Sequence, residues 1–259
     1  MTQQKKPTID ALIDAVLPCH DQKRVTDIRI GLGYTAVKLN SGECGVACTL
    51  RHRLEDDTCS LLPHAGTMAG LEVVEAIPLL RSQNMLEAAV GLATINAIAA
   101  PALPQSASTA DAPLSKFLGI TSKDRVGMVG YIGPIVKELQ QCAHEVIVFD
   151  EAKTMMKGIT PTEQEAQIFP HCDVVILSAT SLLNKTFDSL LEMALNTREI
   201  CVMGPSTPLL PEVFRERRIT LLAGRRILDA DKILQIVSEA GGTKRFEQVT
   251  QKVYLPLKV

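Results

Sequence analysis

The chain has 259 residues, of which 46% are hydrophobic and 22% charged, and its formal net charge is -2. This composition is ordinary for a globular protein and excludes a largely disordered chain. With three Tyr, six Phe and no Trp, and with no excess of cations, the chain is not expected to bind nucleic acid. Its length favours two domains over one.

One apolar run, at 85–103, is long enough to raise the question of a membrane span. Glu87, Thr94, Asn96 and Pro101 interrupt it, which predicts a buried core helix instead. The polar start of the chain lacks the uninterrupted apolar segment of a secretory signal. The seven cysteines include no Cys-x-x-Cys pair, which indicates reduced thiols, so we expect a cytoplasmic protein with no metal ligands among them.

The N-terminal part of the chain alternates between helical and strand patterns. Apolar residues at helical spacing predict a helix at 9–17, which Pro18 ends. Period-2 alternation between turn residues then predicts an antiparallel meander. Its strands are expected at 25–30, 34–39 and 45–50, and two helices at 70–80 and 85–99. Together these elements predict a small α+β domain.

A segment rich in proline, alanine and serine, 99–115, shows neither the helical nor the strand periodicity of apolar residues. It marks the expected boundary between domains 1–105 and 106–259. Beyond it, strands and helices alternate. The predicted strands are 125–129, 145–149, 173–177, 199–203 and 220–222, and the predicted helices are 134–142, 162–169, 185–194, 211–215 and 229–239. This order predicts a parallel sheet with right-handed crossovers and helices on both faces, a Rossmann-like α/β domain.

Glycines follow the first of these strands. In an open parallel sheet the loops after the strand ends meet at one crevice, where ligands bind. Gly130 and Gly133 let the backbone turn tightly into a helix whose amides can face an anion. Asp150 ends the next strand, where a carboxylate can accept hydrogen bonds from ribose hydroxyls. Together, the glycine loop and Asp150 suggest a nucleoside-type cofactor such as S-adenosylmethionine. The alternative is a close helix–sheet contact with a solvated Asp150.

Hydroxyl side chains follow the third and fourth strands of this unit. Ser178 and Thr180 follow the third, and Ser206 and Thr207 lie between two prolines after the fourth. Because prolines fix φ on both sides, the Ser206–Thr207 pair suits a phosphate or carboxylate, unless it only caps a helix. Asn96, on an apolar helix, either faces a cleft between the domains or caps a neighbouring backbone group. No catalytic triad is recognisable, so the catalytic residues stay unknown.

The order of these segments resembles, along nearly the whole chain, a family of two-domain proteins described as putative heavy-metal chelation. The matching stretches are GLGYTAV at 31–37, GVACT at 45–49, GLATINA at 91–97, VGMVGYIGP at 126–134, DVVILSAT at 173–180, GPSTP at 204–208 and GGT at 241–243. The resemblance implies an enolase N-terminal-like domain before a Rossmann-like domain, with partial likeness to methyltransferases. It also implies a site at their junction that Asn96 reaches.

The resemblance further implies a small anionic or heterocyclic metabolite of pterin, flavin or siderophore type, linked to heavy-metal chelation, that the chain binds and modifies. Two alternatives stay open: a non-catalytic binder of a metal chelate, and an S-adenosylmethionine-dependent methyltransferase. We expect a small-molecule partner, no membrane, and a homodimer as the default assembly. The expected ligand-binding residues are Asn96, Gly130, Gly133, Asp150, Ser178, Thr180, Ser206 and Thr207.

Overall fold

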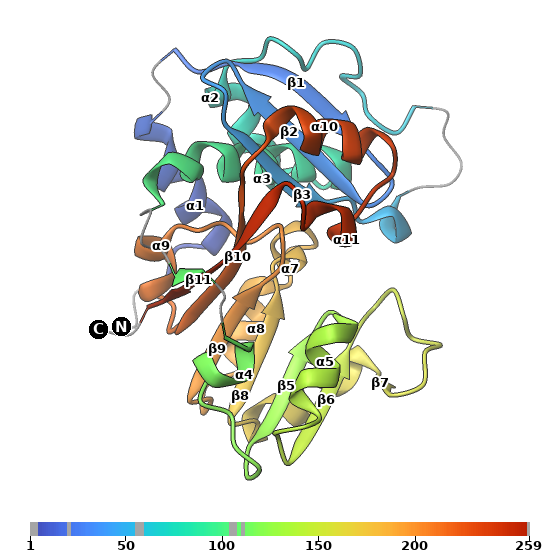
Figure 1. Ribbon diagram of the computed structural model, residues 1–259, viewed down its shortest axis with the longest axis vertical. Helices are drawn as coiled ribbons and strands as arrows, with labels where there is room; N and C mark the ends of the chain where they lie inside the picture. The colour runs from blue at the N-terminus through green and yellow to red at the C-terminus, as the bar shows by residue number, and fades with distance from the viewer. Residues whose placement is uncertain (1–4, 20–21, 55–59, 104–107, 110–111, 258–259) are drawn as a thin grey trace.

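The computed structural model of the chain describes residues 5–19, 22–54, 60–103, 108–109 and 112–257. It contains a three-stranded antiparallel sheet and an eight-stranded mixed sheet. The small sheet and its helices form the upper half of the molecule, and the large sheet runs through the lower half (Figure 1). The predicted fold class, a Rossmann-like parallel sheet preceded by a smaller α+β unit, is confirmed.

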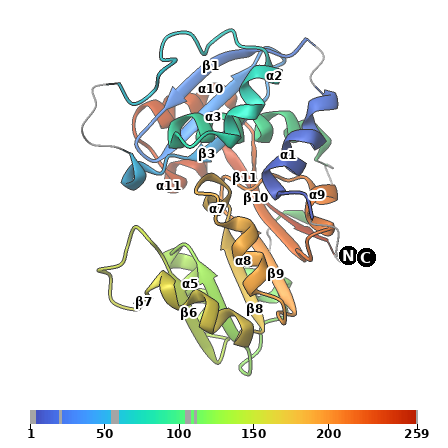
Figure 2. The same cartoon turned by 180° about the vertical axis from the view of Figure 1, so that it is seen from behind.

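The small sheet consists of β1 (Val25–Ile30), β2 (Tyr34–Leu39) and β3 (Cys44–Cys48), in that order. Helix α3 (Met85–Ala99) packs on one face of it and α10 (Ala230–Ser238) on the other, as the views from the two sides show (Figures 1 and 2).

Both helices approach the strands closely. A Cβ atom added at Gly45 would lie 2.0 Å from the Ala93 carbonyl oxygen of α3, and one added at Gly31 would lie 2.1 Å from the Val237 carbonyl oxygen of α10. Glycine is therefore required at both contacts, because any larger residue would push a helix off the sheet. A helix from the end of the chain thus completes the sheet formed at its beginning.

The remaining helices of the N-terminal part differ in their bounds from the prediction. Helix α1 spans Thr8–Val16, and a 3-10 turn, η1 (Leu17–Cys19), follows it. The helix expected at 70–80 is a single α-turn, α2 (Val73–Ala76), continued by the 3-10 helix η3 (Ile77–Arg81). Pro78 lies at the start of η3; it has no amide hydrogen, so the α-helical hydrogen-bond pattern cannot continue through it.

The large sheet has the strand order β4-β11-β10-β9-β8-β5-β6-β7. All five predicted parallel strands are present: β5 (Arg125–Val129), β6 (Glu145–Phe149), β8 (Val174–Ser178), β9 (Glu199–Met203) and β10 (Leu221–Ile227). A two-residue strand, β7 (Ile159–Thr160), pairs in parallel with β6. From β7 to β10 the order is 3-2-1-4-5-6, that of Rossmann folds, and the switch point lies between β5 and β8.

Two strands at one edge of the large sheet were not predicted. Strand β11 (Thr250–Pro256) runs antiparallel to β10, and β4 (Ser108–Thr109) pairs with β11. The prediction also ended β10 at 222, five residues before its end at Ile227. The second half of β10 carries Arg225 and Arg226 opposite polar residues of β11, so backbone pairing rather than apolar burial defines this segment of the two strands.

Further helical segments follow α3 or lie, along the chain, between strands of the large sheet. They are η4 (Ala100–Ala102), α4 (Leu114–Phe117), α5 (Gly133–Leu139), η5 (Thr162–Gln164), α6 (Glu165–Ile168), η6 (Phe169–His171), α7 (Thr180–Leu183), α8 (Phe187–Met193), α9 (Pro211–Arg215) and α11 (Thr243–Phe246). The helix expected at 162–169 is split by 3-10 turns, and α7 occupies a predicted loop. The expected linker is only partly described, since 104–107 and 110–111 lie outside the described residues.

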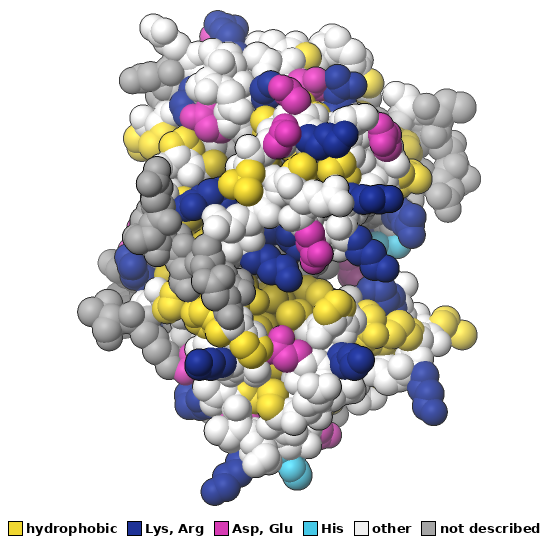
Figure 3. Space-filling model, viewed as in Figure 1, with side chains coloured by type: hydrophobic (Ala, Val, Ile, Leu, Met, Phe, Trp, Pro, Cys, Tyr) yellow, Lys and Arg dark blue, Asp and Glu magenta, His cyan; other side chains and the backbone are white. Residues whose placement is uncertain are grey.

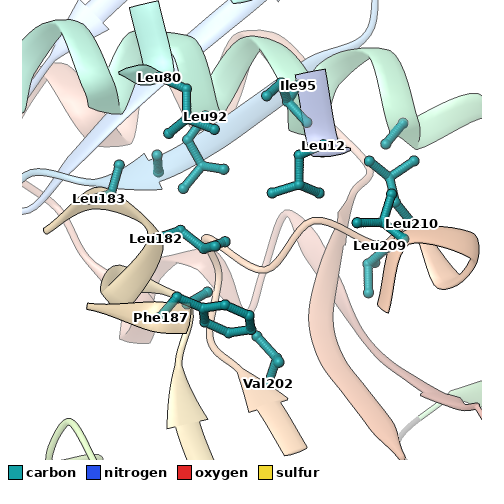
Figure 4. Close-up of a cluster of buried hydrophobic side chains, with 14 of the residues drawn as sticks. Leu12, Leu80, Leu92, Ile95, Leu182, Leu183, Phe187, Val202, Leu209 and Leu210 are labelled. Carbon is teal, nitrogen blue, oxygen red and sulfur yellow. The ribbon is translucent and has the colours of Figure 1, made fainter. Parts of the chain in front are cut away.

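One apolar core runs through both halves of the chain. Leu12, Leu92 and Ile95 from the N-terminal part are buried against Leu182 and Phe187 from the Rossmann-like part (Figure 4). We call this contact the apolar joint, and it comprises Leu12, Leu80, Leu92, Ile95, Leu182, Leu183, Phe187, Val202, Leu209 and Leu210. Burial on this scale fixes the two parts relative to each other.

The segment Met85–Ala102, which contains α3, is long and apolar enough to cross a membrane by length and composition alone. In this fold, however, 72% of that window is buried inside the protein. It therefore serves as the central helix of the apolar joint, where the sequence predicted a core helix.

Candidate functional site: a cleft between the two parts

A cleft of about 750 Å³ opens above the carboxyl ends of β5, β6 and β8. The Rossmann-like part contributes Gly130, Asp150 and Ser178 to its wall, and the N-terminal part contributes Leu32 and Arg51. The position is the switch point of the sheet, where such folds bind ligands, and the volume suits a small molecule. On the face shown in Figure 3, Lys and Arg side chains and a histidine gather at the right-hand end of the waist between the two halves.

The glycine loop after β5 lies at the base of this cleft. Gly130 has a φ of 88°, and a Cβ atom there would lie 2.7 Å from the Cβ of Ser178. Only glycine fits both the left-handed backbone and the close approach of the loop after β8. Gly133 starts α5 beside the Tyr131 ring and is outside the cleft wall. Of the two predicted glycines, the structure therefore brings Gly130 to the cleft.

Asp150 lies in the cleft wall, but its carboxylate already has several donors. It accepts hydrogen bonds from the Tyr131 amide at 2.8 Å and the Ala152 amide at 3.0 Å, and Lys153 Nζ lies 3.2 Å away. The side chain is only 10% exposed. A carboxylate can accept about four hydrogen bonds, so these donors already use most of its capacity, and the bond from the Tyr131 amide holds the glycine loop in place.

Ser178 and Thr180 also line the cleft. The Thr180 hydroxyl donates to Ser178 Oγ at 2.8 Å, and the Ser181 hydroxyl donates to the Ser178 carbonyl oxygen at 2.7 Å. Because Ser178 Oγ accepts from Thr180, its own proton remains available to a ligand. The structure thus brings together Gly130, Asp150, Ser178 and Thr180.

Three other predicted ligand residues lie between the two parts of the chain but outside the cleft wall. Asn96 Nδ2 donates to the carbonyl oxygens of Val46 at 2.9 Å and Ser206 at 3.1 Å. Ser206 Oγ accepts from the Cys48 amide at 2.8 Å, and the Thr207 hydroxyl donates to the Ala223 carbonyl oxygen at 3.2 Å.

Ser206 and Thr207 are only 2% and 4% exposed, and neither they nor Asn96 line the cleft. Main-chain groups of both parts engage Asn96 Nδ2, Ser206 Oγ and the Thr207 hydroxyl, so these side chains connect β3, α3 and the loop after β9. Asn96 Oδ1 is buried without a hydrogen-bond partner among the described residues. Cys48 does line the cleft, which places Ser206 directly behind the wall rather than in it.

A charged cluster in the cleft was not predicted from the sequence. Glu151, just after β6, binds the 3-10 helix η2 (Arg51–Arg53) of the N-terminal part. Arg53 donates to its two oxygens at 2.9 and 2.5 Å, and His52 Nε2 lies 2.7 Å from Oε1. Asn184 donates from 3.4 Å. Burial alone would raise the pKa of Glu151, but the hydrogen bonds from Arg53 and His52 lower that pKa to about 2.

Two further residues of the cleft wall have no such partners. Glu165, at the start of α6, is half-buried, and Arg51 is exposed; neither side chain has a hydrogen bond or ion pair within the described part of the chain. Burial, together with the charges of Glu151 and Glu163, raises the pKa of Glu165 to about 7. In the sequence, the only signal for Arg51 is its position just after a predicted strand.

The donor groups of the residues that the structure describes do not form a site for a directly bound metal ion. Among the residues that the structure describes, no group of three or more His, Cys, Asp or Glu side chains could hold one. Cys44, Cys172 and Cys201 are buried in the interior, where burial raises the pKa of each thiol. The cleft, rather than a cluster of cysteines, is therefore the candidate site.

Comparison with known proteins supports one family. Two family models, both described as "Putative heavy-metal chelation", match residues 113–256 and 9–99. An uncharacterised protein of Methanocaldococcus jannaschii is 28% identical over 238 residues, 88% of each chain. A crystal structure of a Pyrococcus horikoshii protein of unknown function, from the DUF364 family, is also similar to this chain. The two share 25% sequence identity and superpose with a TM-score of 0.84, over 96% of this chain and 99% of that one.

A second DUF364 structure, from Desulfitobacterium hafniense, has a TM-score of 0.80 and 23% identity over 96% of both chains, and shows the same fold. The two family models together cover both parts of the chain, including the walls of the cleft on either side. The protein therefore belongs to the family described as putative heavy-metal chelation.

Proposed function

We propose that the cleft binds a small anionic or heterocyclic metabolite of pterin, flavin or siderophore type, linked to heavy-metal chelation, and that the protein modifies it. The observation that carries this proposal is the cleft itself, about 750 Å³ at the switch point of the sheet, with walls from both parts of the chain. The family description supports the link to chelation, through a chelating metabolite rather than through protein ligands.

Arg51 supports an anionic group on the ligand. The other cations of the cleft have carboxylate partners: Arg53 binds Glu151, and Lys153 lies beside Asp150. Arg51 lines the cleft without a partner in the described residues. A guanidinium group in a water-exposed cleft is well suited to a carboxylate or phosphate of the ligand.

Apolar side chains of the cleft support a ring system. Leu32, 62% exposed, and the Tyr131 ring both line the cleft. An apolar wall with a few convergent polar groups is typical of sites for heterocyclic ligands. The S-adenosylmethionine alternative finds less support, because the Asp150 carboxylate is engaged by the amides of Tyr131 and Ala152.

The proposal is tested by isothermal titration calorimetry with three probes: riboflavin 5′-phosphate, pterin-6-carboxylate and 2,3-dihydroxybenzoate. We expect at least one to bind the wild-type protein, and Arg51→Ala to weaken it about tenfold or more, the loss of a charge-assisted contact. Arg215→Ala, which removes an exposed arginine of α9, should leave the affinity unchanged. Failure of all three probes to bind overturns the proposal, and equal binding by Arg51→Ala overturns the role of Arg51.

A further inference from the structure

We propose that Glu165 is the proton-transfer group of the cleft, exchanging a proton with the bound ligand through its carboxyl group. The inference rests on the proposed function, because it requires a ligand in the cleft. It adds a chemical step, general acid–base catalysis, and a residue that performs it.

The position of Glu165 is the first support. It starts α6 and lines the cleft together with Glu151, Ser178 and Asn184. Its half-buried carboxyl group has no hydrogen-bond or ion-pair partner within the described residues, so nothing described in the protein competes with a ligand for it. A carboxyl group that serves only to stabilise the first turn of a helix has no need to be buried in a cleft.

The contrast with Glu151 is the second support. Both carboxyl groups belong to the same cleft, but Glu151 receives hydrogen bonds from Arg53 and Asn184 and lies beside His52, whereas Glu165 receives none from the described residues. Their surroundings accordingly separate the pKa of Glu151, about 2, from that of Glu165, about 7. Two carboxyl groups of one site with separated pKa values are the pattern of acid–base catalysis.

In the described part of the chain, the elements with the most contacts to α6 carry few charged groups. The neighbouring elements contribute Glu163 on η5, His171 on η6, and Asp188 and Glu192 on α8, and the loop after β6 contributes Glu151. After burial, the charges of Glu151 and Glu163 raise the pKa of Glu165. At neutral pH both forms of the Glu165 carboxyl group are therefore populated, while Glu151 stays ionised.

The step is balanced without a further reactant. The O–H bond of the neutral Glu165 carboxyl group breaks as an O–H or N–H bond forms on the ligand, and the carboxylate then recovers its proton from water. In the reverse direction the Glu165 carboxylate removes a proton from the ligand. Glu151 remains a carboxylate throughout, because Arg53 and His52 hold it in that form.

The titration of Glu165 is measured by NMR on protein labelled with 13C at the glutamate carboxyl carbons. We expect one resonance with a midpoint near pH 7, absent in Glu165→Gln and shifted to lower pH in Glu151→Gln and Glu163→Gln. Glu192→Gln, which changes an exposed glutamate of α8, should leave that resonance unchanged. If no glutamate titrates above pH 6, the inference is overturned.

Contact with the ligand is measured by calorimetry of the three probes at pH 7 in two buffers of different ionisation enthalpy, which gives the protons exchanged on binding. We expect Glu165→Gln to change that number by about half a proton and Glu192→Gln to leave it as in the wild type. If a probe binds and Glu165→Gln exchanges the same number of protons, only the inference fails. If no probe binds the wild-type protein, the proposed function fails with it.

Discussion

Two of the contacts between the two parts of the chain differ in almost every physical respect. At the apolar joint, Leu12, Leu92 and Leu182 are fully buried, and each contributes about 1.5–3 kcal/mol through burial. At the cleft, Arg53 and Glu151 form an ion pair whose side chains are 39% and 31% exposed, worth about 0–1 kcal/mol. One contact fixes the arrangement, and the other can exchange its partners for water or a ligand at little cost.

The largest expected effect comes from opening a cavity in the apolar joint. Leu182 is fully buried in α7, and Leu182→Ala should lower the free energy of unfolding by about 2–5 kcal/mol. Urea unfolding measures this, with Leu195→Ala as the control, because Leu195 is 66% exposed and its loss should cost less than about 0.5 kcal/mol. Equal effects of the two changes would mean that the joint does not hold the parts together.

A smaller effect is expected behind the cleft wall. Ser206→Ala removes the acceptor of the Cys48 amide, a buried contact between the two parts, and should cost about 1–3 kcal/mol. Because Ser206 lies outside the cleft wall, the affinity of Ser206→Ala for a probe should stay within about twofold of the wild-type affinity. Ser178→Ala, which removes a hydroxyl of the cleft wall, should instead lose affinity about tenfold, the value of one hydrogen bond. If Ser206→Ala lost probe binding but kept the wild-type stability, Ser206 would have to be assigned to the ligand site.

Glu165→Gln should affect stability in a pH-dependent way. The folded pKa of Glu165, about 7, exceeds the ordinary value of about 4.3, so the folded state holds more protons between these values and wild-type stability falls as pH rises through them. Glu165→Gln has no ionisable group at this position, so its stability does not fall in this way. At pH 8 it should be more stable than wild type by on the order of 1 kcal/mol, after a discount for solvent screening. Urea unfolding at pH 5 should show the difference disappearing; a difference independent of pH would contradict the raised pKa.

The smallest effect is expected at the ion pair across the cleft. A double-mutant cycle of Arg53→Ala and Glu151→Gln should give a coupling free energy below about 1 kcal/mol. The folded pKa of Glu151, about 2, lies below its ordinary value, so this contribution is present at neutral pH and is lost as pH falls through about 2. A coupling above about 2 kcal/mol, beyond the range of exposed pairs, would make the cleft as rigid as the joint and remove the contrast between them.

The parallel strands could be predicted because each is buried on both faces and reads as an apolar run, such as Val174–Ser178. Strand β11 could not, since its Gln251 and Lys252 belong to an edge where backbone pairing decides. From the sequence, the candidate site could be predicted only where its residues follow the ends of predicted strands. Gly130, Asp150 and Ser178 follow such ends, whereas the surroundings of Glu165 exist only after β6, η2 and α6 have come together.

Asn96 shows the same limit at a single residue. Its sequence context allowed two interpretations, a residue facing a cleft or a donor to nearby backbone groups. In the structure its amide donates to the carbonyl groups of Val46 and Ser206. These partners come from segments far apart in the chain, so local patterns could not identify them.

The cover that α10 gives to the first sheet has a consequence for biosynthesis. Strands β1 to β3 leave the ribosome well before α10, whose buried Ile233 and Val237 belong to the same apolar cluster as Ala36 and Val46. Until then one face of the nascent sheet lacks its apolar cover and is open to aggregation. The N-terminal part therefore reaches its final packing only after synthesis of nearly the whole chain.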